Sequence, residues 1–489
     1  MSTDLPTRRA AARRRRGRAF IATFTAVVGV LAVLGLAGAA AGGVQGPRVT
    51  AVQVDPNAAA TASGARLIVT MNQSLHPVKA TQVTVSPAAD FTVDTSGRGM
   101  GVRFTLPLHD DTEYTVRFTG VTGLGGGPSA SVTERFRTPK LHVYLLQRGT
   151  TGDRILRTDL EGTDPQPVFR AAHIEDFRAT SSHLAVSTLD AHGKAALVVT
   201  DLAGKHQRDL PLPGDGTIST LQSADRGELI GYTYSDANLG SPGARESRLY
   251  IASLKDAAAH TKPTPVAGAG KEQRVADWRF VPDSDSILVL TYDGRIALRS
   301  ATGGDSADLG SGNAIDGIAR GSSQAVVERA DGMVVIDLTD GSPHPLQTAR
   351  LTDRARDVPG AMGVVVPLPG KAGGSLRPYT VLDVAGGSGA GQGVAEGTTV
   401  YRVAADGAAT PVFDVPPTDA IMQVCASPSG QYAAIAVAPG MTANPYDDYL
   451  LPMPEKVITH VVELADAREV HAFTGFGVSW CQVPPPVGQ

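Results

Sequence analysis

A strand pattern that recurs six times between residues 155 and 466 restricts the fold more than any other feature of the sequence. Each copy is an apolar strand that ends near an Asp-Leu pair, or a variant of it, and runs into a turn. The copies are ILRTDLEG (155–162), LVVTDLAG (197–204), LYIASLKD (249–256), MVVIDLTDG (333–341), VYRVAADG (400–407) and ITHVVELAD (458–466). Repeats of this kind indicate small sheets that pack on their neighbours, because one such unit cannot bury its own faces. We therefore predict a repetitive all-β region over residues 140–489.

A second recurring element is read as the inner strand of each unit. Its copies lie at 176–178, 218–221, 276–280, 315–318, 362–366, 422–425 and 478–481. The turn that follows is explicit in Ser427-Pro428-Ser429-Gly430 and in Pro282-Asp283-Ser284-Asp285. Together these motifs resemble the TolB-type, WD40-like β-propeller, whose signature is a Ser-Pro-Asp-Gly turn followed by an "LYxxDLxxG" strand. The likeness is degenerate, since Ser429 stands where Asp is expected.

The resemblance implies a β-propeller, and the inner strands give a count of seven blades. Counts of six or eight blades are the alternatives, because the pattern in residues 351–385 is irregular. The first and last segments are expected to complete one blade together, by pairing of 141–169 with 475–483. Such closure removes two open sheet edges.

Residues 47–139 show period-2 alternation of apolar and polar residues in several short segments. Successive side chains point to opposite faces of a strand, so about seven such segments in about ninety residues fit a β-sandwich. The opening VTAVQVDP, the later DTEYTVRFTGVTGLGG and the closing RFRTP resemble a bacterial Ig-like domain of surface-layer proteins. That family implies a spacer or adhesion module.

An apolar run from Ala19 to about Ala41 follows a basic segment at 1–18 that holds seven arginines. As a helix this run reaches roughly 30 Å, the thickness of a bilayer core. The positive-inside rule predicts a cytoplasmic N-terminus and a single-pass location in the cell membrane, with the later domains outside the cytoplasm. A cleaved signal peptide is the alternative, because small residues at 37–41 offer a cleavage site. Anchor, Ig-like domain and propeller together indicate an actinobacterial-type envelope protein.

The net charge of -4 and the absence of a basic cluster on the predicted folded part argue against a nucleic-acid partner. The two cysteines, Cys425 and Cys481, fall at the same register of consecutive inner strands. A disulfide between them is a candidate, and two buried free thiols are the alternative.

No catalytic or cofactor motif is found: the sequence lacks HExxH, CxxC, a GxSxG elbow and a P-loop. The eleven histidines do not pair at metal-ligand spacing, so neither a metal nor a cofactor is predicted. Asp176, Asp277 and Asp316 begin inner strands, where they could line a channel or cap turns, and turns are favoured.

Three long insertions, at 236–247, 384–397 and 439–456, are expected on one face of the propeller. Loops on a rigid scaffold often carry binding, although they can also be tolerated surface insertions. The candidate binding residues are Asn238, Arg245, Tyr446, Asp447, Asp448 and Tyr449. The sequence thus predicts a non-enzymatic binding or scaffold protein of the cell envelope, with an envelope protein or glycan as partner. The alternative is a propeller hydrolase or lyase acting on envelope glycans or peptides.

Overall fold

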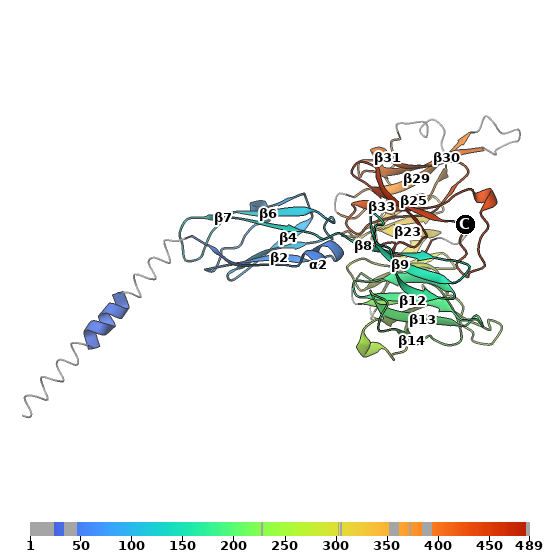
Figure 1. The fold of residues 1–489 in the computed structure, drawn as a ribbon, viewed down its shortest axis with the longest axis horizontal. Coiled ribbons are helices and arrows are strands. Elements are labelled where there is room, and N and C mark those ends of the chain that lie inside the picture. The colour runs from blue at the N-terminus through green and yellow to red at the C-terminus, as the bar shows by residue number, and fades with distance from the viewer. Residues whose placement is uncertain are drawn as a thin grey trace, which may run out of the picture. The chain divides into compact units, whose positions relative to one another are not determined.

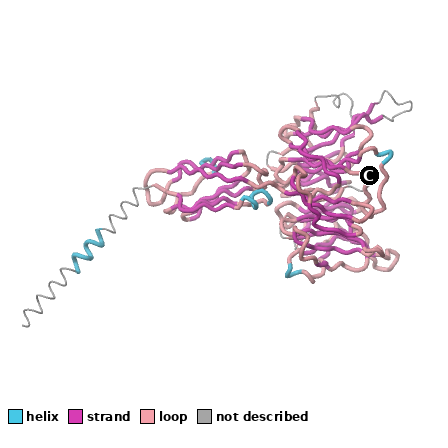
Figure 2. Tube along the Cα trace, in the orientation of Figure 1, coloured by secondary structure: helices cyan, strands magenta, loops and turns pink. Residues whose placement is uncertain are grey.

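The computed structural model describes residues 24–33, 46–225, 228–301, 303, 306–351, 361–370, 373–383 and 394–485. It is all-β, as predicted, with helix confined to short segments (Figure 2). The chain divides into two compact units. The smaller one holds Arg66–Arg103 and Glu113–Phe136, and the larger one holds Phe104–Thr112 and the chain from Arg137 onward.

The smaller unit is built from two antiparallel sheets. One has the order β1-β2-β5-β4, with β1 (Val49–Val54), β2 (Arg66–Met71), β5 (Gly99–Phe104) and β4 (Phe91–Ser96). The other has the order β3-β6-β7, with β3 (Val83–Ser86), β6 (Glu113–Val121) and β7 (Ala130–Arg137). Alternate residues such as Leu67, Val69, Tyr114 and Val116 are buried, as period-2 strands require. Membership of the Ig-like family stays a prediction, because the sheet order alone does not identify it.

In the larger unit the described residues form seven consecutive antiparallel sheets (Figure 1). The first sheet holds β8 (His142–Gln147), β9 (Asp153–Asp159) and β10 (Gln166–Ala171). The second holds β11 (Ile174–Ala179), β12 (His183–Leu189), β13 (Ala195–Asp201) and β14 (Arg208–Leu210). The third holds β15 (Gly216–Ser223), β16 (Leu229–Asp236), β17 (Arg248–Ser253) and β18 (Thr264–Pro265). The next two are β19 (Val275–Phe280), β20 (Ser286–Thr291), β21 (Arg295–Ser300), β22 (Ala307–Ser311); and β23 (Ala314–Ile318), β24 (Gln324–Arg329), β25 (Gly332–Asp337), β26 (Pro343–Pro345). The last two are β27 (Ala361–Met362), β28 (Val366–Pro367), β29 (Ser375–Asp383), β30 (Val394–Val403), β31 (Ala409–Val415); and β32 (Ala420–Ala426), β33 (Tyr432–Ala438), β34 (Ile458–Glu463), β35 (Arg468–Thr474).

The second strand of a blade is apolar on both faces, because a neighbouring sheet covers each face. In β20 the run Ile287–Leu290 is buried throughout, and in β33 every residue from Tyr432 to Ala438 is buried. These strands therefore do not alternate in burial, unlike those of the smaller unit. Burial of both faces is what stacking of each sheet between two others requires.

Apolar clusters between neighbouring sheets, together with the contact of β23 with β28 between the fifth and sixth sheets, show that the sheets close into a ring. Leu197 of β13 packs with Tyr232 of β16, and the same relation of one sheet to the next recurs along the chain. The last sheet then packs on the first, because Val461 of β34 shares a cluster with Leu145 of β8. A ring of radially packed four-stranded sheets is a β-propeller.

The first sheet has only three named strands, and a later segment completes it. Leu146 and Phe476 exchange two backbone hydrogen bonds, with N···O distances of 2.9 and 3.0 Å. The backbone N–H of Ser479 donates to the carbonyl of Tyr144 at 3.0 Å. The segment 476–479 thus covers the edge of β8 that would otherwise face the ring axis.

The predicted single-pass membrane location is contradicted by the structure. A helix over residues 24–33 lies within the expected span. Within the part of the chain that the structure describes, no helix is both long enough and apolar enough to cross a membrane. Residues 1–23 and 34–45, which contain the rest of the predicted anchor and the small-residue cleavage sites, lie outside the described residues.

Candidate functional site

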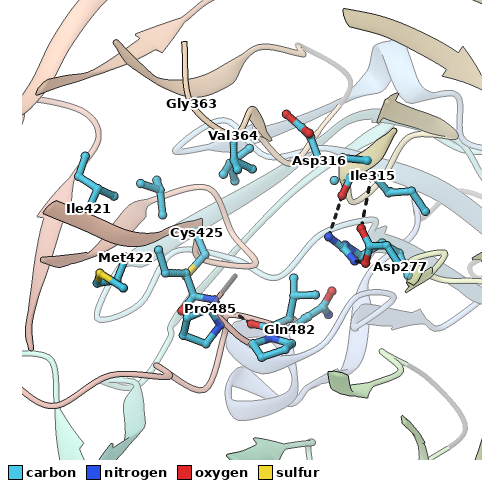
Figure 3. A pocket seen from close by; sticks show the side chains of 18 of the residues that line it. Asp277, Ile315, Asp316, Gly363, Val364, Ile421, Met422, Cys425, Gln482 and Pro485 are labelled. Atoms are coloured by element: carbon cyan, nitrogen blue, oxygen red, sulfur yellow. Dashed lines mark hydrogen bonds and ion pairs between the residues drawn. The ribbon is translucent and has the colours of Figure 1, made fainter. Parts of the chain in front are cut away.

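A cavity of about 1360 Å³ lies among the inner strands of the propeller (Figure 3). Residues of six inner strands line it, so it occupies the axis of the ring. These strands are β11, β15, β19, β23, β28 and β32. The cavity is concave and lined by both apolar and polar side chains, and sites of this kind are where proteins commonly hold ligands.

A bulge interrupts the pairing of each of the five longer inner strands with its neighbour. The register shifts after Ile174, Ser219, Val275, Ile315 and Ile421. Bulges of this kind bend a strand and redirect its side chains. Each bulge contributes at least one residue to the cavity lining, namely Asp176, Thr220, Asp277, Asp316 and Gln423.

Two of these bulges carry the same Asp-x-Arg motif. One oxygen of Asp176 accepts the N–H of Phe177 at 2.8 Å, and Asp277 accepts that of Trp278 at the same distance. Each carboxylate also pairs with the arginine two residues later, Arg178 or Arg279. Burial raises the pKa of Asp176, and Arg178 opposes the rise.

Asp316 sits on the next blade and faces the same cavity (Figure 3). Its Oδ2 accepts the backbone N–H of Val365 at 2.7 Å. Burial raises its pKa to about 6, and the charges of Glu328 and Asp277 add to the rise, while the hydrogen bond from Val365 and the charge of Arg279 oppose it. The sequence interpretation favoured turns for Asp176, Asp277 and Asp316. The structure instead places all three on the cavity wall.

The cavity has an apolar rim. Tyr446, Leu450 and Val364 line the cavity and remain 47%, 51% and 42% exposed. Tyr446 and Leu450 belong to the predicted loop 439–456. Large apolar side chains that stay exposed beside a cavity are typical of an interaction site.

Buried charged side chains hold the loop 439–456 against the propeller. Arg148, at the end of β8, pairs with Asp447 at 2.7 Å, and the two side chains are only 8% and 14% exposed. Arg148 also donates to the carbonyls of Leu451 (2.9 Å) and Glu175 (2.8 Å). The loop is therefore anchored to the first and second blades by groups distant from it in sequence.

Glu175 and Tyr449 complete the anchor. The two oxygens of Glu175 accept the backbone N–H groups of Leu450 and Leu451 at 3.1 and 3.0 Å. The Tyr449 hydroxyl donates to Asp153 at 2.9 Å, and its ring stacks on His173 at 3.7 Å between centroids. The result is a loop in which Asp447 and Tyr449 are held by internal contacts while Tyr446 and Leu450 remain exposed.

The structure separates the predicted binding residues into two groups. Tyr446 and Asp448 are exposed, whereas Asp447 and Tyr449 are committed to internal contacts. Arg245 forms a bidentate pair with Asp236, at 2.6 and 3.0 Å, and Asn238 is exposed nearby. Neither Asn238 nor Arg245 lines the cavity with Tyr446. Most of the insertion 384–397 lies outside the described residues.

Cys425 and Cys481 form a disulfide, with a Cα–Cα distance of 5.5 Å. Cys425 belongs to β32 and lines the cavity, while Cys481 follows the segment that completes the first blade. The bond therefore fixes the end of that segment to the wall. Among the described residues no group of three or more His, Cys, Asp or Glu is placed to bind a metal.

No protein-family profile matches the chain. A curated protein, the 3-phosphoshikimate 1-carboxyvinyltransferase of Roseobacter denitrificans, is 25% identical over 316 residues, which are 64% of this chain and 58% of that protein. The chain thus spans less than two thirds of the length of this relative. An identity this low does not show membership of its family.

Solved structures with a similar fold share 11–12% sequence identity with the chain. A putative 6-phosphogluconolactonase from Bacteroides fragilis has a TM-score of 0.40, and the match covers 69% of this chain and 96% of that one. The dihydro-heme d1 dehydrogenase NirN has a TM-score of 0.39 and covers 69% of this chain and 74% of that one. A prolyl endopeptidase structure also has 0.39, covering 86% and 54%. These neighbours are mostly β-propeller-like proteins, and the same architecture follows here from the order and packing of the chain's own sheets.

Proposed function

We propose that this chain is a non-catalytic binding protein whose β-propeller receives a protein partner at the rim of the axial cavity. The observation that carries the proposal is the loop 439–456. It is locked by buried charges and holds Tyr446 and Leu450 in solvent. A loop that is ordered before binding loses little conformational entropy when a partner binds. The free energy gained by burying its exposed apolar side chains is therefore offset only slightly by that entropy cost.

The chemistry of the rim favours a protein over a glycan. Leu450 and Val364 are purely aliphatic, and they offer burial but no hydrogen bonds to sugar hydroxyls. Tyr446 adds an aromatic ring with a polar tip, a residue type enriched at the centre of protein interfaces. Burying a fully exposed leucine side chain contributes about 1.5–3 kcal/mol, and Leu450 is already about half buried, so loss of Leu450 alone is expected to weaken binding about 4- to 12-fold.

The test selects peptides from a display library on the immobilised full chain and measures their affinities by fluorescence anisotropy. The variant Tyr446→Ser/Leu450→Ser is expected to lose at least tenfold in affinity. Leu239→Ser is the matched control, because Leu239 has the same 51% exposure as Leu450 but lies outside the cavity. Ligands that respond to the Leu239 change and ignore the rim change would refute the proposal.

A second candidate function is a propeller enzyme that hydrolyses or cleaves glycans or peptides. The observation that favours it is the carboxyl group of Asp316, whose pKa of about 6 suits a general acid, near Asp277 in the same cavity. Two carboxyl groups that share one cavity are a common acid and base arrangement.

Turnover of a panel of peptides and glycans by the full chain tests this second candidate. If Asp316 is the acid, Asp316→Asn should lower the rate at least 100-fold, which is the usual contribution of general acid catalysis. Absence of turnover in the wild-type chain leaves binding as the function.

A further inference from the structure

A short proline-containing segment of the chain occupies part of the axial cavity. Residues 482–485, with the sequence Gln-Val-Pro-Pro, follow the disulfide at Cys481 and line the cavity, where Figure 3 labels Gln482 and Pro485. Pro485 is buried, and the three residues before it are partly buried. This segment is not one of the blade strands, so its contacts describe what the cavity wall accepts as a ligand.

The wall binds the main chain of the segment through two side-chain donors. Nε of Arg178 donates to the carbonyl of Gln482 at 3.1 Å, and Nε2 of Gln423 donates to the carbonyl of Val483 at 2.8 Å. Arg178 is on β11 and Gln423 is on β32, the inner strands on either side of the closing blade. Two consecutive carbonyls are therefore recognised from two sides.

Both donors are buried: Arg178 is 2% exposed and Gln423 is 9% exposed. A third buried group, Asp225, accepts a hydrogen bond from the side chain of Gln482 while it pairs with Arg320. Buried charged groups are costly unless they are paired, so their use here indicates a specific site rather than a chance contact.

Proline suits this wall for a simple reason. Pro484 and Pro485 have no N–H, so the segment brings carbonyl acceptors but few donors to a wall that offers the side-chain donors Arg178 and Gln423. Proline also fixes φ near −65° and keeps the segment extended, which lowers the entropy lost on binding. Met422, Val424 and Pro428 are among the apolar residues of the wall.

We propose that this wall is a binding site for extended proline-containing peptides, and that residues 482–485 are its internal occupant. The disulfide between Cys481 and Cys425 tethers the occupant, so a peptide from another protein competes against a local concentration in the millimolar range. The site binds a partner peptide when the segment is displaced. This inference is independent of the rim, because none of the contacts that carry it involves Tyr446 or Leu450.

The test uses a fluorescein-labelled peptide with the sequence of residues 482–487 and, as the control probe, the same peptide with alanine in place of its three prolines. Two released variants are compared with the full chain. One ends after Cys481 and keeps the disulfide, and the other is the full-length Pro484→Ala/Pro485→Ala chain. Anisotropy titration is expected to give binding to both released variants that is at least tenfold tighter than to the wild-type chain, and at least tenfold tighter than for the control probe.

Gln423→Ala in the shortened chain removes one of the two carbonyl donors, and the expected loss is about five- to tenfold. The fluorescence of Trp278 and Trp480 confirms folding of each variant, since both tryptophans lie in the propeller. The inference is overturned if neither released variant prefers the proline probe, or if the wild-type chain binds it as tightly as they do. Tyr446→Ser/Leu450→Ser should leave probe binding unchanged, which separates failure of this inference from failure of the proposed function.

Discussion

Replacing Asp316 by asparagine should stabilise the propeller at alkaline pH and have a smaller effect in acid. Asp316 ordinarily has a pKa of 3.8, and in the folded chain burial raises this to about 6. The folded state therefore holds the proton more tightly than the unfolded state. Between pH 3.8 and about 6 the unfolded chain has lost this proton while the folded chain keeps it, so stability falls as the pH rises through that window.

The size of the effect follows from the same two values. The difference of about 2.2 corresponds, at about 1.4 kcal/mol per pH unit, to a penalty of about 3 kcal/mol above pH 6. At pH 4.5 this penalty is only about 1 kcal/mol. Asp316 faces the cavity and is partly exposed, so we expect a gain of about 1–3 kcal/mol at pH 8. Asparagine keeps a side-chain oxygen that can accept the backbone N–H of Val365, so this hydrogen bond is retained.

Tryptophan fluorescence during urea unfolding measures this gain at pH 4.5 and pH 8. Trp278 is fully buried in β19 and Trp480 lies beside the disulfide, so both report on the propeller alone. Asp448→Asn is the control, because it removes an exposed carboxylate from the same unit. An equal shift at both pH values, or no stabilisation at pH 8, would show that burial of Asp316 does not penalise its charge.

Three further changes test other parts of the structure. Cys481→Ser should lower the stability by about 2–4 kcal/mol, because the disulfide closes a separation of 56 residues, and a smaller loss in urea unfolding would contradict this. Arg148→Met leaves Asp447 buried without its partner and should cost about 3–5 kcal/mol in the same assay, whereas a cost under about 1 kcal/mol would mean that the loop is not held by this pair. Glu175→Gln should speed hydrogen exchange at the amides of Leu450 and Leu451 at least tenfold with little change at β33, and unchanged exchange would remove Glu175 from the anchor.

The strand pattern of the propeller could be predicted from the sequence because it is local. The six repeated motifs coincide with β9, β13, β17, β25, β30 and β34, each the third strand of its blade counted from the ring axis. The seventh third strand, β21, was missed because its sequence RIALRS lacks the Asp-Leu ending. Five of the predicted inner strands lie within β11, β15, β19, β23 and β32, whereas the predicted inner strand at 478–481 is a turn and the first blade pairs with Phe476 instead.

The function of the loop 439–456 could not be read from its composition. Asp447 and Tyr449 were predicted to contact a partner, and in the structure they contact Arg148 and Asp153, which are 299 and 296 residues away in sequence. No local pattern reveals partners at that separation. For Asp176 and Asp277 the sequence left channel lining and turn capping open and favoured turns, because a bulge that turns a side chain inward leaves no mark in the sequence. The membrane location was wrong, and it rested on apolar length and flanking charge alone.

The pairing of Leu146 with Phe476 has a consequence for the order in which the molecule can be made. A ribosome that adds 5–20 residues per second needs roughly 15–65 seconds to travel from one of these residues to the other. During that interval the edge of β8 has unpaired backbone N–H and C=O groups, which can form hydrogen bonds with a strand of this chain or of another protein. The first blade is therefore the part of the propeller that we expect to be most prone to aggregation during synthesis, and slower elongation should increase aggregation without altering the finished fold.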